Sequence, residues 1–423
     1  MTDSKPLLAL TQDSDYDPNS MAPDKAREYI RAFLTPIVTT ESVPVRTALG
    51  RVLAQDIVSP INVPGHDNSG MDGYAVRHAD LKPDTDVTLK IIGTSFAGKP
   101  YLGPVSAGEA IRIFTGAVVP PGCDTIVMQE RAQAKDGQVT LGAGARLGQN
   151  RRFAGEDIQA GAVVLKRGDP IRPAELGLIA SLGIGEVALY RKLRVAFFST
   201  GDELVPVGGT LGPGQIFDSN RYTMFGMLER LGCDVLDMGM VPDVPEAVEA
   251  AFASAAAAAD VVMTSGGVSV GDADYVKQML DRLGEVLFWK IAMKPGRPLA
   301  FGRIGNAHFF GLPGNPVAVM VTFYQFVRDA LLIISGRTRV APVPTFKARL
   351  TSPIKKAPGR TEYQRGILTR GDEGRWEVRT TGDQGSGILS SMSQANCFIV
   401  LPQDQASAEA GLMVDVQSFE GVV

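Results

Sequence analysis

The alternation of apolar and polar positions between residues 193 and 335 predicts strands that alternate with helices. Three apolar runs, at 194–198, 260–264 and 308–310, each lead into a polar loop with glycine and then into a helical stretch. The predicted helices begin near 221, 273 and 316, and an alanine-rich helix covers 245–259. Strands that are apolar throughout are buried on both faces, so the pattern indicates a parallel sheet covered by helices.

Shorter β-type stretches flank this α/β section on both sides. A helix is predicted for 23–34, followed by short β-type stretches between 42 and 63. Several short strands with regularly spaced turns in 87–141 suggest a small β-barrel or sandwich. A second linking section, 148–192, carries a predicted helix at 173–182, and short strands return at 344–351, 375–380, 397–401 and 412–418. We therefore predict a multidomain chain of α/β plus β class, preceded by a disordered lead over residues 1–20.

Length and composition narrow the class of protein. A chain of 423 residues is too long for one hydrophobic core, and 44% apolar with 21% charged residues is typical of a globular protein. A net charge of −4, without a block of like charges, argues against a nucleic-acid partner but is compatible with a small anion as ligand. The cysteines Cys123, Cys233 and Cys397 lie far apart, which argues against disulfides and a cysteine zinc site. No signal peptide and no apolar run of about eighteen residues is evident, so we expect a cytoplasmic protein that does not enter a membrane.

The polar loops after the three strands are the first candidates for a binding site, because ligands of open parallel sheets bind outside the carboxyl ends of the strands. In loop 265–272 the glycines let the backbone approach an anion, and the following helix presents free N–H groups. Asp272 and Asp274 lie there as well. Carboxylates repel a phosphate unless a cation lies between them, so the pair points to Mg²⁺. Capping of the helix is the simpler explanation for Asp272, whereas we assign a function to Asp274.

Several other charged residues allow two interpretations each. Within eight residues the chain carries Lys290, Lys294 and Arg297, either in a solvated turn or as charges that bind an oxyanion such as phosphate. Glu203, after the first strand, is a cap or a ligand. Asp72, in a polar loop with glycines, is a turn former or a site residue.

Two apparent motifs are weaker than their spacing suggests. Residues 93–99 have the spacing of a phosphate-binding loop, but Pro100 stands where a Ser or Thr would hold Mg²⁺. Residues 267–271 match a hydrolase nucleophile elbow with Ser269 as the nucleophile, and His308 is the only histidine downstream. A serine hydrolase is therefore an alternative function, and in that case Ser269→Ala abolishes activity.

Nine motifs along the chain resemble those of one family. They are DNSGMDGYAVR (67–77), RIFTGAVVP (112–120), GEDI (155–158), FSTGDEL (198–204), SGGVSVGDADY (265–275), KPGRP (294–298), GLPGNPV (311–317), QRG (364–366) and QGSG (384–387). In this order they are similar to the motifs of the MoeA family of molybdopterin molybdenumtransferases, to which a domain of gephyrin also belongs. The resemblance runs from Met21 to Phe419. Two residues depart slightly from the family motifs. The family usually has Lys where this chain has Arg297, and many members have Ala where this chain has Gly70.

The resemblance implies a fold of four domains in an elongated homodimer, with the active cleft formed between subunits. An elongated linking domain would cover 21–64 and 149–192, and a β domain inserted in it would cover 65–148. A molybdopterin-binding α/β domain would follow at 193–340, and a C-terminal β-barrel at 341–423.

The resemblance also implies the reaction: molybdate is inserted at the dithiolene of adenylylated molybdopterin, and AMP is released with Mg²⁺. It implies catalytic roles for Asp274, Asp72, Lys290 and Lys294, with Asp72 reaching the partner subunit's cleft, and Mg²⁺ ligands in Asp274, Glu203 and Asp243. The substrate contacts that it implies are Thr115, Asp157, Glu203, Asp243, Ser265, Gly266, Gly267, Ser269, Gly271, Arg297, Pro313, Gly314, Asn315, Arg365 and Ser386. Among these, Arg365 and Ser386 match an oxyanion site, for which a guanidinium and a hydroxyl are suitable chemistry.

Two further alternatives follow from the same resemblance. A scaffolding protein that keeps the fold without catalysis is conceivable from the gephyrin comparison, but the implied cleft residues are all present here. A molybdopterin adenylyltransferase resembles only 193–335, and the flanking domains argue against it. Possible protein partners are the adenylyltransferase that supplies the substrate and the proteins that receive the cofactor.

Overall fold

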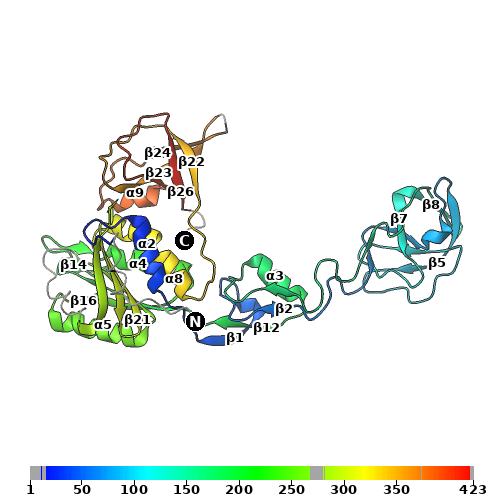
Figure 1. Cartoon of the computed structure of the whole chain (residues 1–423), viewed down its shortest axis with the longest axis horizontal. Helices are drawn as coiled ribbons and strands as arrows, with labels where there is room; N and C mark the ends of the chain where they lie inside the picture. The colour runs from blue at the N-terminus through cyan, green and yellow to red at the C-terminus, as the bar shows by residue number, and fades with distance from the viewer. Residues whose placement is uncertain (1–10, 12–15, 267–279, 281, 373, 420–423) are drawn as a thin grey trace.

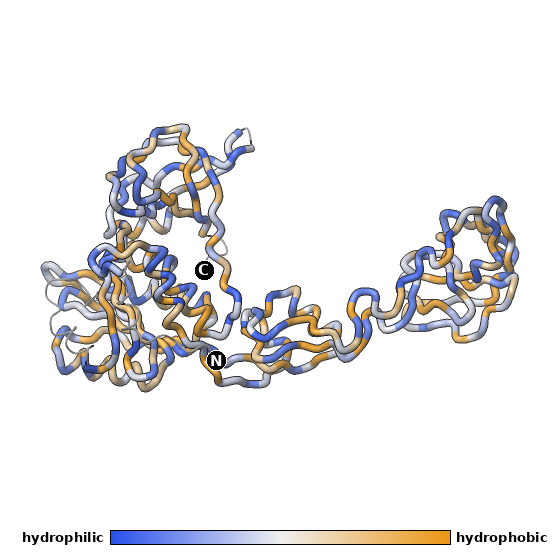
Figure 2. The backbone as a smooth tube through the Cα atoms, in the orientation of Figure 1, coloured by the Kyte–Doolittle hydropathy of each residue, from blue (hydrophilic) through white to orange (hydrophobic). Residues whose placement is uncertain are grey.

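The chain folds into an elongated molecule with a bulky end, a narrow middle and a separate β domain at the far end (Figure 1). This computed structural model describes residue 11, residues 16–266, residue 280, residues 282–372 and residues 374–419. Hydrophobic segments run through each of these parts (Figure 2), and the buried apolar side chains form separate clusters in them. Each part therefore has a core of its own.

The bulky end is built on a six-stranded sheet that confirms the predicted α/β class. Its strands, in spatial order, are β16 (Asp234–Val241), β13 (Arg194–Thr200), β17 (Val261–Ser265), β21 (Ala307–Leu312), β20 (Pro298–Ile304) and β18 (Gly284–Lys290). The first four run parallel, as predicted. Strand β20 runs antiparallel to both of its neighbours, because it turns directly into β21 through Gly305 and Asn306, and β18 again has the direction of the first four. The sheet is therefore mixed at one edge rather than parallel throughout.

Helices cover both faces of this sheet. Among the described residues they are α2 (Pro23–Phe33), α4 (Ser219–Arg230), α5 (Pro245–Ala258), α7 (Pro316–Thr322), the π-helical η4 (Phe323–Val327) and α8 (Arg328–Ile334), whereas most of the helix predicted from 273 lies outside them. Alternate residues of a strand point to opposite faces. Val195 and Phe197 thus pack with α2, α4, α7 and α8, whereas Ala196 and Phe198 pack with α5. Helix α2, which the resemblance assigns to the linking domain, contributes its buried side chains to the core of the α/β sheet.

One helical run is more apolar than expected from the sequence, in which no stretch of about eighteen apolar residues is evident. The 19 residues Pro316–Ile334 are long and apolar enough to cross a membrane, with a mean hydropathy of 1.7. However, 72% of the most apolar stretch is buried inside the protein. The run is a core helix, and its apolar composition follows from the burial of most of its surface.

The narrow middle is made by two separate passes of the chain. The strands β1 (Thr40–Pro44) and β2 (Ile57–Val58) of the first pass pair with β12 (Glu186–Tyr190) and β11 (Val163–Leu165) of the second. Helix α3 (Pro173–Ser181) covers them, and Leu53, Ile179 and Leu189 lie in the shared core. A short pair, β3 (Asn68–Ser69) with β10 (Arg151–Arg152), leads to the far end.

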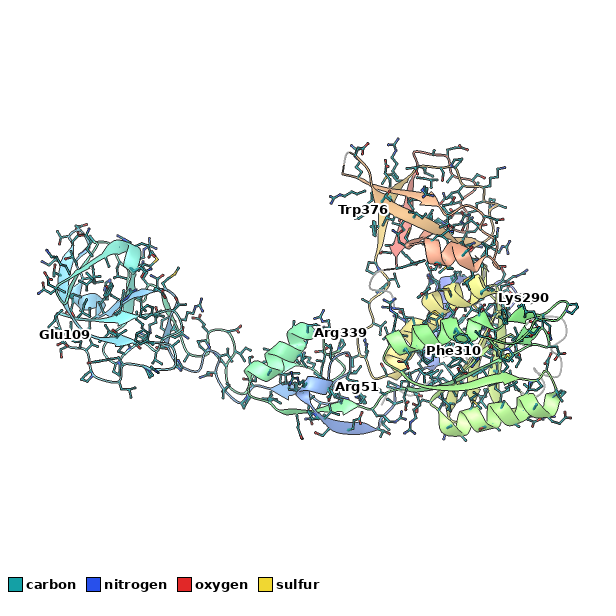
Figure 3. All side chains as sticks on the ribbon, turned by 180° about the vertical axis from the view of Figure 1, so that it is seen from behind. Arg51, Glu109, Lys290, Phe310, Arg339 and Trp376 are labelled. Atoms are coloured by element: carbon teal, nitrogen blue, oxygen red, sulfur yellow. The ribbon has the colours of Figure 1, made fainter. Side chains whose placement is uncertain are left out.

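The far β domain is one curled sheet of six strands, not the barrel or sandwich that the strand spacing suggests. In spatial order the strands are β7 (Thr125–Met128), β4 (Gly73–Val76), β6 (Glu109–Ile113), β5 (Val87–Ser95), β9 (Gln138–Leu141) and β8 (Ala132–Lys135). Figure 3, in which Glu109 marks this domain, shows it well separated from the α/β end, where Lys290 and Phe310 lie.

The C-terminal domain is a closed five-stranded barrel, as the resemblance implies. Its strands are β22 (Thr345–Leu350), β23 (Thr361–Arg370), β24 (Trp376–Thr380), β25 (Cys397–Leu401) and β26 (Met413–Ser418), and β25 pairs back with β23. The short strand β19 (Met293–Lys294) of the α/β part adds to β23, and helix α9 (Leu389–Gln394) lies between the two domains. The barrel is thereby attached beside the carboxyl ends of the central strands.

Candidate functional site

A cleft of about 1270 Å³ lies where the barrel meets the carboxyl ends of the parallel strands. Its floor is formed by the residues that follow β13, β17 and β21, and the barrel contributes residues 383–387. This is the position in which open α/β sheets bind ligands. Ten of the predicted site residues line it: Glu203, Asp243, Ser265, Gly266, Lys294, Arg297, Pro313, Gly314, Asn315 and Ser386.

Close backbone approach holds the loops of the cleft together. Gly266 has φ +87°, and a Cβ there would lie 2.6 Å from the Thr200 carbonyl oxygen, so only glycine fits. Asn220, at the start of α4, donates from Nδ2 to Ser265 Oγ at 2.8 Å and to the Gly314 carbonyl at 2.6 Å. The loops after β17 and β21 are therefore fixed to one another through Asn220.

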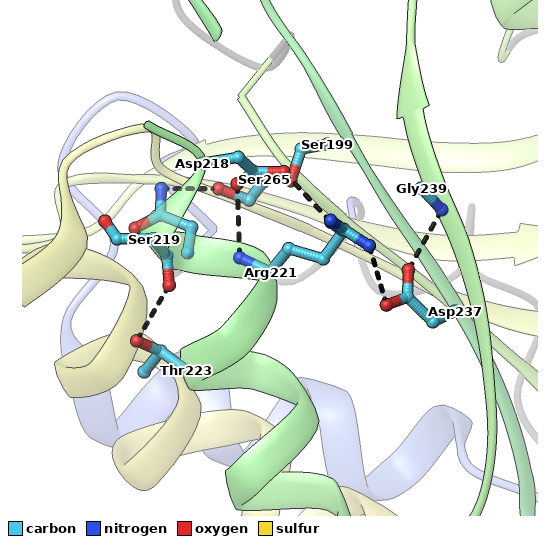
Figure 4. Close-up of polar contacts among 9 residues, drawn as sticks. Ser199, Asp218, Ser219, Arg221, Thr223, Asp237, Gly239 and Ser265 are labelled. Carbon is cyan, nitrogen blue, oxygen red and sulfur yellow. Dashed lines mark hydrogen bonds and ion pairs between the residues drawn. The ribbon is translucent and has the colours of Figure 1, made fainter. Parts of the chain in front are cut away.

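Asp218 anchors the start of α4 beneath the cleft (Figure 4). Its carboxylate is buried and accepts from Ser199 Oγ at 3.1 Å and from the Arg221 backbone N–H at 3.2 Å. Arg221 in turn donates to Asp237 at 2.9 Å. The sequence pattern does not single out Asp218 or Asn220, although Asp before a helical stretch is a signature of an N-cap.

A tight turn presents two cations to the cleft. Lys294 and Arg297 are exposed, whereas Pro295 and Gly296 between them are buried. Gly296 has φ +94°, and a Cβ there would lie 2.5 Å from Thr322 Oγ1, which fixes the turn against α7. Arg360, just before β23, also lines the cleft, but the sequence pattern does not predict it. Three cationic side chains therefore line the same cleft.

The Lys294 ammonium lies near the buried carboxylate of Glu362. Its Nζ lies 3.7 Å from Oε1 of Glu362, whose side chain is only 7% exposed, while the Lys294 side chain is 50% exposed. Gln364 donates to the other Glu362 oxygen at 2.8 Å. The buried carboxylate orients the lysine without covering it.

Two predicted residues lie next to the cleft but do not line it. Arg365 is buried and donates to Ser391 Oγ and to the Gly385 carbonyl, both at 2.9 Å. Burial lowers the pKa of this guanidinium. Arg365 therefore holds the loop that carries Ser386 rather than facing a ligand. Lys290 lies half-buried on the edge strand β18, in register with Pro298.

The oxygen ligands at the cleft fit Mg²⁺ in part. Glu203 and Asp243 supply carboxylates, and Oδ1 of Asn220 is buried with no hydrogen-bond partner among the described residues. Hard oxygen donors of this kind suit Mg²⁺, which proteins commonly bind through one or two carboxylates plus substrate phosphates. In the described part of the chain, no three His, Cys, Asp or Glu side chains lie close enough to hold a metal by themselves.

Three other predicted residues lie away from the cleft. Asp72 and Thr115 belong to the far β domain, where Asp72 Oδ1 accepts from the Thr115 backbone N–H and from its hydroxyl, both at 2.8 Å. These two hydrogen bonds lower the pKa of Asp72. Asp157 is exposed beside the joint between that domain and the middle section, and its backbone N–H donates to Val63. Asp274, Gly267, Ser269 and Gly271 lie outside the described residues.

The serine hydrolase alternative loses its general base. His308 lies near the amino end of β21, whereas the cleft lies beyond the carboxyl end of that strand. The ring is 2% exposed, and its Nε2 accepts from the Thr35 backbone N–H at 3.3 Å. Burial, together with the nearby Arg303, lowers the pKa of His308 to about 4. A neutral, buried ring at this position packs the core and serves no nucleophile in the cleft.

The buried His308 is expected to make the fold sensitive to acid. Above pH 6.5 the ring is neutral in both the folded and the unfolded state, so protonation of His308 does not reduce the stability of the fold. As the pH falls from 6.5 to about 4, the unfolded chain takes up a proton that the folded state resists, so stability decreases by about 3 kcal/mol. Urea unfolding at several pH values tests this, with His308→Gln as the control. An equal acid loss in the two proteins would contradict it.

Comparison with known proteins follows the same division of the chain. Residues 21–183 match the MoeA N-terminal region (domain I and II), 196–332 match a probable molybdopterin binding domain, and 347–419 match the MoeA C-terminal region (domain IV). These matches, together with the closed barrel and the α/β sheet, confirm the fold class predicted from the sequence.

Relatives of this chain extend over nearly its whole length. The molybdopterin molybdenumtransferase of Haemophilus influenzae is 46% identical over 397 residues, which covers 94% of this chain and 98% of the relative. The protein of the same name from Nostoc sp. is 37% identical, covering 88% of this chain and 87% of the relative. The crystal structure of the molybdopterin biosynthesis moeA protein of Pyrococcus horikoshii has a TM-score of 0.82 at 28% identity, and covers 95% of this chain and 100% of that one. The chain therefore belongs to the MoeA family of molybdopterin molybdenumtransferases.

Proposed function

We propose that this protein is a transferase of molybdenum cofactor biosynthesis that inserts molybdate into the dithiolene of adenylylated molybdopterin, with Mg²⁺-dependent release of AMP. The names of the relatives support the transfer of molybdenum to molybdopterin. The cleft at the carboxyl ends of the parallel strands is the observation that carries the assignment, because it combines three cations with carboxylates in one space.

The charged side chains of the cleft suit both the oxyanions of this reaction and its Mg²⁺ ion. Lys294, Arg297 and Arg360 can bind oxyanions, and guanidinium groups do so with two parallel hydrogen bonds. Glu203 and Asp243 are the candidate ligands for Mg²⁺, together with Asp274. A bound Mg²⁺ supplies neutralisation of the phosphoanhydride oxygens. The side chains themselves bind and orient the anions, so positioning and electrostatics are the main contributions of the protein.

We infer that the working unit is a homodimer. Asp72 and Thr115, which the family resemblance assigns to the site, lie in the far β domain, and the cleft lies at the opposite end of the elongated chain (Figure 1). A second copy can bring this domain to the cleft, and two-fold dimers are the commonest arrangement of identical chains. The three cysteines are free and buried, which supports a reducing, cytoplasmic location. An adenylyltransferase is the expected supplier of the substrate.

The proposed reaction is tested by release of AMP. The purified protein is incubated with adenylylated molybdopterin, and AMP and molybdenum cofactor are measured with and without molybdate and with Mg²⁺ or a chelator. We expect release that needs both molybdate and Mg²⁺, and that is lost in Asp274→Asn and Glu203→Gln. Glu249→Gln is the matched control, since Glu249 lies on α5 and pairs with Arg282 outside the cleft.

The scaffold alternative predicts a different result. Tight binding of the pterin without any AMP release would contradict the transferase and leave a carrier or scaffold. Release that continues at full rate without molybdate would instead indicate a simple hydrolase of the adenylate.

A further inference from the structure

One edge of the far β domain gathers aromatic side chains beside Asp72. Strands β5 and β6 run parallel and β4 runs antiparallel to β6, with Ser95 and Gly73 both in register with Ile113. Phe96 follows β5, Phe114 follows β6 and Asp72 precedes β4. All three residues therefore leave the sheet at the same edge, one position beyond the last paired residues.

Four side chains form a continuous stack at this edge. The guanidinium of Arg112 lies over the Tyr74 ring at 5.1 Å and over the Phe114 ring at 4.7 Å. The Phe96 and Phe114 rings stack with centroids 4.9 Å apart and planes inclined by 8°. Exposure increases along the stack, from buried Tyr74 to Phe96, which is 48% exposed. Phe96 therefore forms the solvent end.

The backbone fixes the Phe96 ring in place. The Phe96 N–H donates to the Lys99 carbonyl at 3.1 Å, and the Lys99 N–H donates back at 3.0 Å. Gly98 has φ +75°, as a turn this tight requires. A ring that is held by a turn and stacked on a second ring loses little conformational entropy when it binds a ligand.

Asp72 supplies a polar group at the same edge. Arg112 donates to the Gly73 carbonyl at 3.0 Å, which connects the stack to the residue next to Asp72. The two hydrogen bonds from Thr115 use Oδ1 and lower the pKa of Asp72, so the carboxylate is ionised at neutral pH. Oδ2 has no hydrogen bond among the described residues. An ionised carboxylate accepts hydrogen bonds from ring N–H and amino groups.

We propose that Phe96 is a stacking platform for a planar nitrogen heterocycle of the substrate, and that Asp72 accepts hydrogen bonds from the N–H groups of that ring. This inference rests on the proposed function, in which the substrate carries both a pterin and an adenine, and in which the far β domain meets the cleft of a second copy. Stacking of a base on an aromatic side chain is worth about 1–3 kcal/mol. Phe96 then positions the substrate and takes no part in the chemical step.

The kinetic test compares Phe96→Leu, which removes the aromatic face but keeps an apolar side chain, with Phe96→Tyr, which keeps the face. We expect the KM for adenylylated molybdopterin to rise about tenfold in Phe96→Leu with little change in kcat, and Phe96→Tyr to behave like the wild type. Trp376→Leu is the matched control, because Trp376 is 44% exposed and also contacts one ring and one arginine, outside the cleft. An unchanged KM in Phe96→Leu overturns the proposal.

Direct binding separates this inference from the proposed reaction and identifies the ring. Neopterin and AMP are titrated into the wild-type dimer and into Phe96→Leu, and the melting temperature of each protein is recorded. Weaker binding of one probe, at an unchanged melting temperature, supports the platform and shows which ring it takes. Equal binding of both probes to both proteins overturns it. A wild type that releases no AMP contradicts the proposed function alone, since the binding measurements still report on Phe96.

Discussion

Replacement of Lys294 by alanine is expected to lower kcat/KM for cofactor formation by about 10²–10³-fold, because one preorganised charge at a reacting oxyanion is worth that much. The Lys294 side chain is oriented by the buried Glu362 at 3.7 Å and is half exposed to the cleft. The turn that carries it is fixed by Gly296 against Thr322. The charge is therefore in place before the substrate binds, which is the condition for a large electrostatic contribution.

Lys347→Ala is the matched control for this variant. Lys347 has a side chain of similar exposure, 59%, and pairs with Asp415 at 3.0 Å on the barrel surface. A surface ion pair of this kind contributes about 0–1 kcal/mol to stability and nothing to the reaction. Steady-state kinetics with molybdate and adenylylated molybdopterin compares the two. If Lys294→Ala and Lys347→Ala retain the same activity, the cationic turn is not part of the site.

The α/β part of the fold could be predicted from the apolar pattern of its strands, and the strands that depart from this pattern do so for physical reasons. The strands β13, β17 and β21 have apolar centres and are buried at every position except Arg194, as expected for strands that helices cover on both faces. Strands β18 and β20 are less uniform, because Glu285 on the edge strand β18 is exposed and Arg303, its partner in register on β20, is half-buried. The antiparallel direction of β20 depends on the Gly305–Asn306 hairpin, a signal that is only two residues long.

The floor of the cleft could be predicted because it depends only on which loops follow parallel strands. The barrel side has no such pattern, since the way in which two domains dock leaves no periodic signal in either, and Ser386 is predicted there from the family motif alone. Arg360 lines the cleft and Arg365, five residues later, supports the loop behind it, although both are arginines near the start of one strand. The family motif identifies Arg365, whereas the geometry adds Arg360.

Two inactive variants are expected to restore activity when they share one dimer. Lys294→Ala removes a cation of the cleft, and Asp72→Ala removes the carboxylate of the far β domain; each homodimer should be nearly inactive. In a hybrid dimer, one cleft lacks both groups and the other has both, provided that Asp72 acts across the subunit boundary. Hybrids isolated with two different affinity tags should then show about half of the wild-type activity.

If Asp72 acts within its own subunit, the hybrid dimer is expected to recover no activity. If Asp72 served the cleft of its own chain, each of the two sites in the hybrid would carry one defect, and the hybrid would remain as inactive as its parents. The two arrangements thus differ between half activity and almost none, which steady-state AMP release distinguishes easily. Because Asp72 and Lys294 lie at opposite ends of an elongated chain, we expect recovery. The same hybrid then shows why the chain is elongated: its length carries the far β domain to the neighbouring cleft.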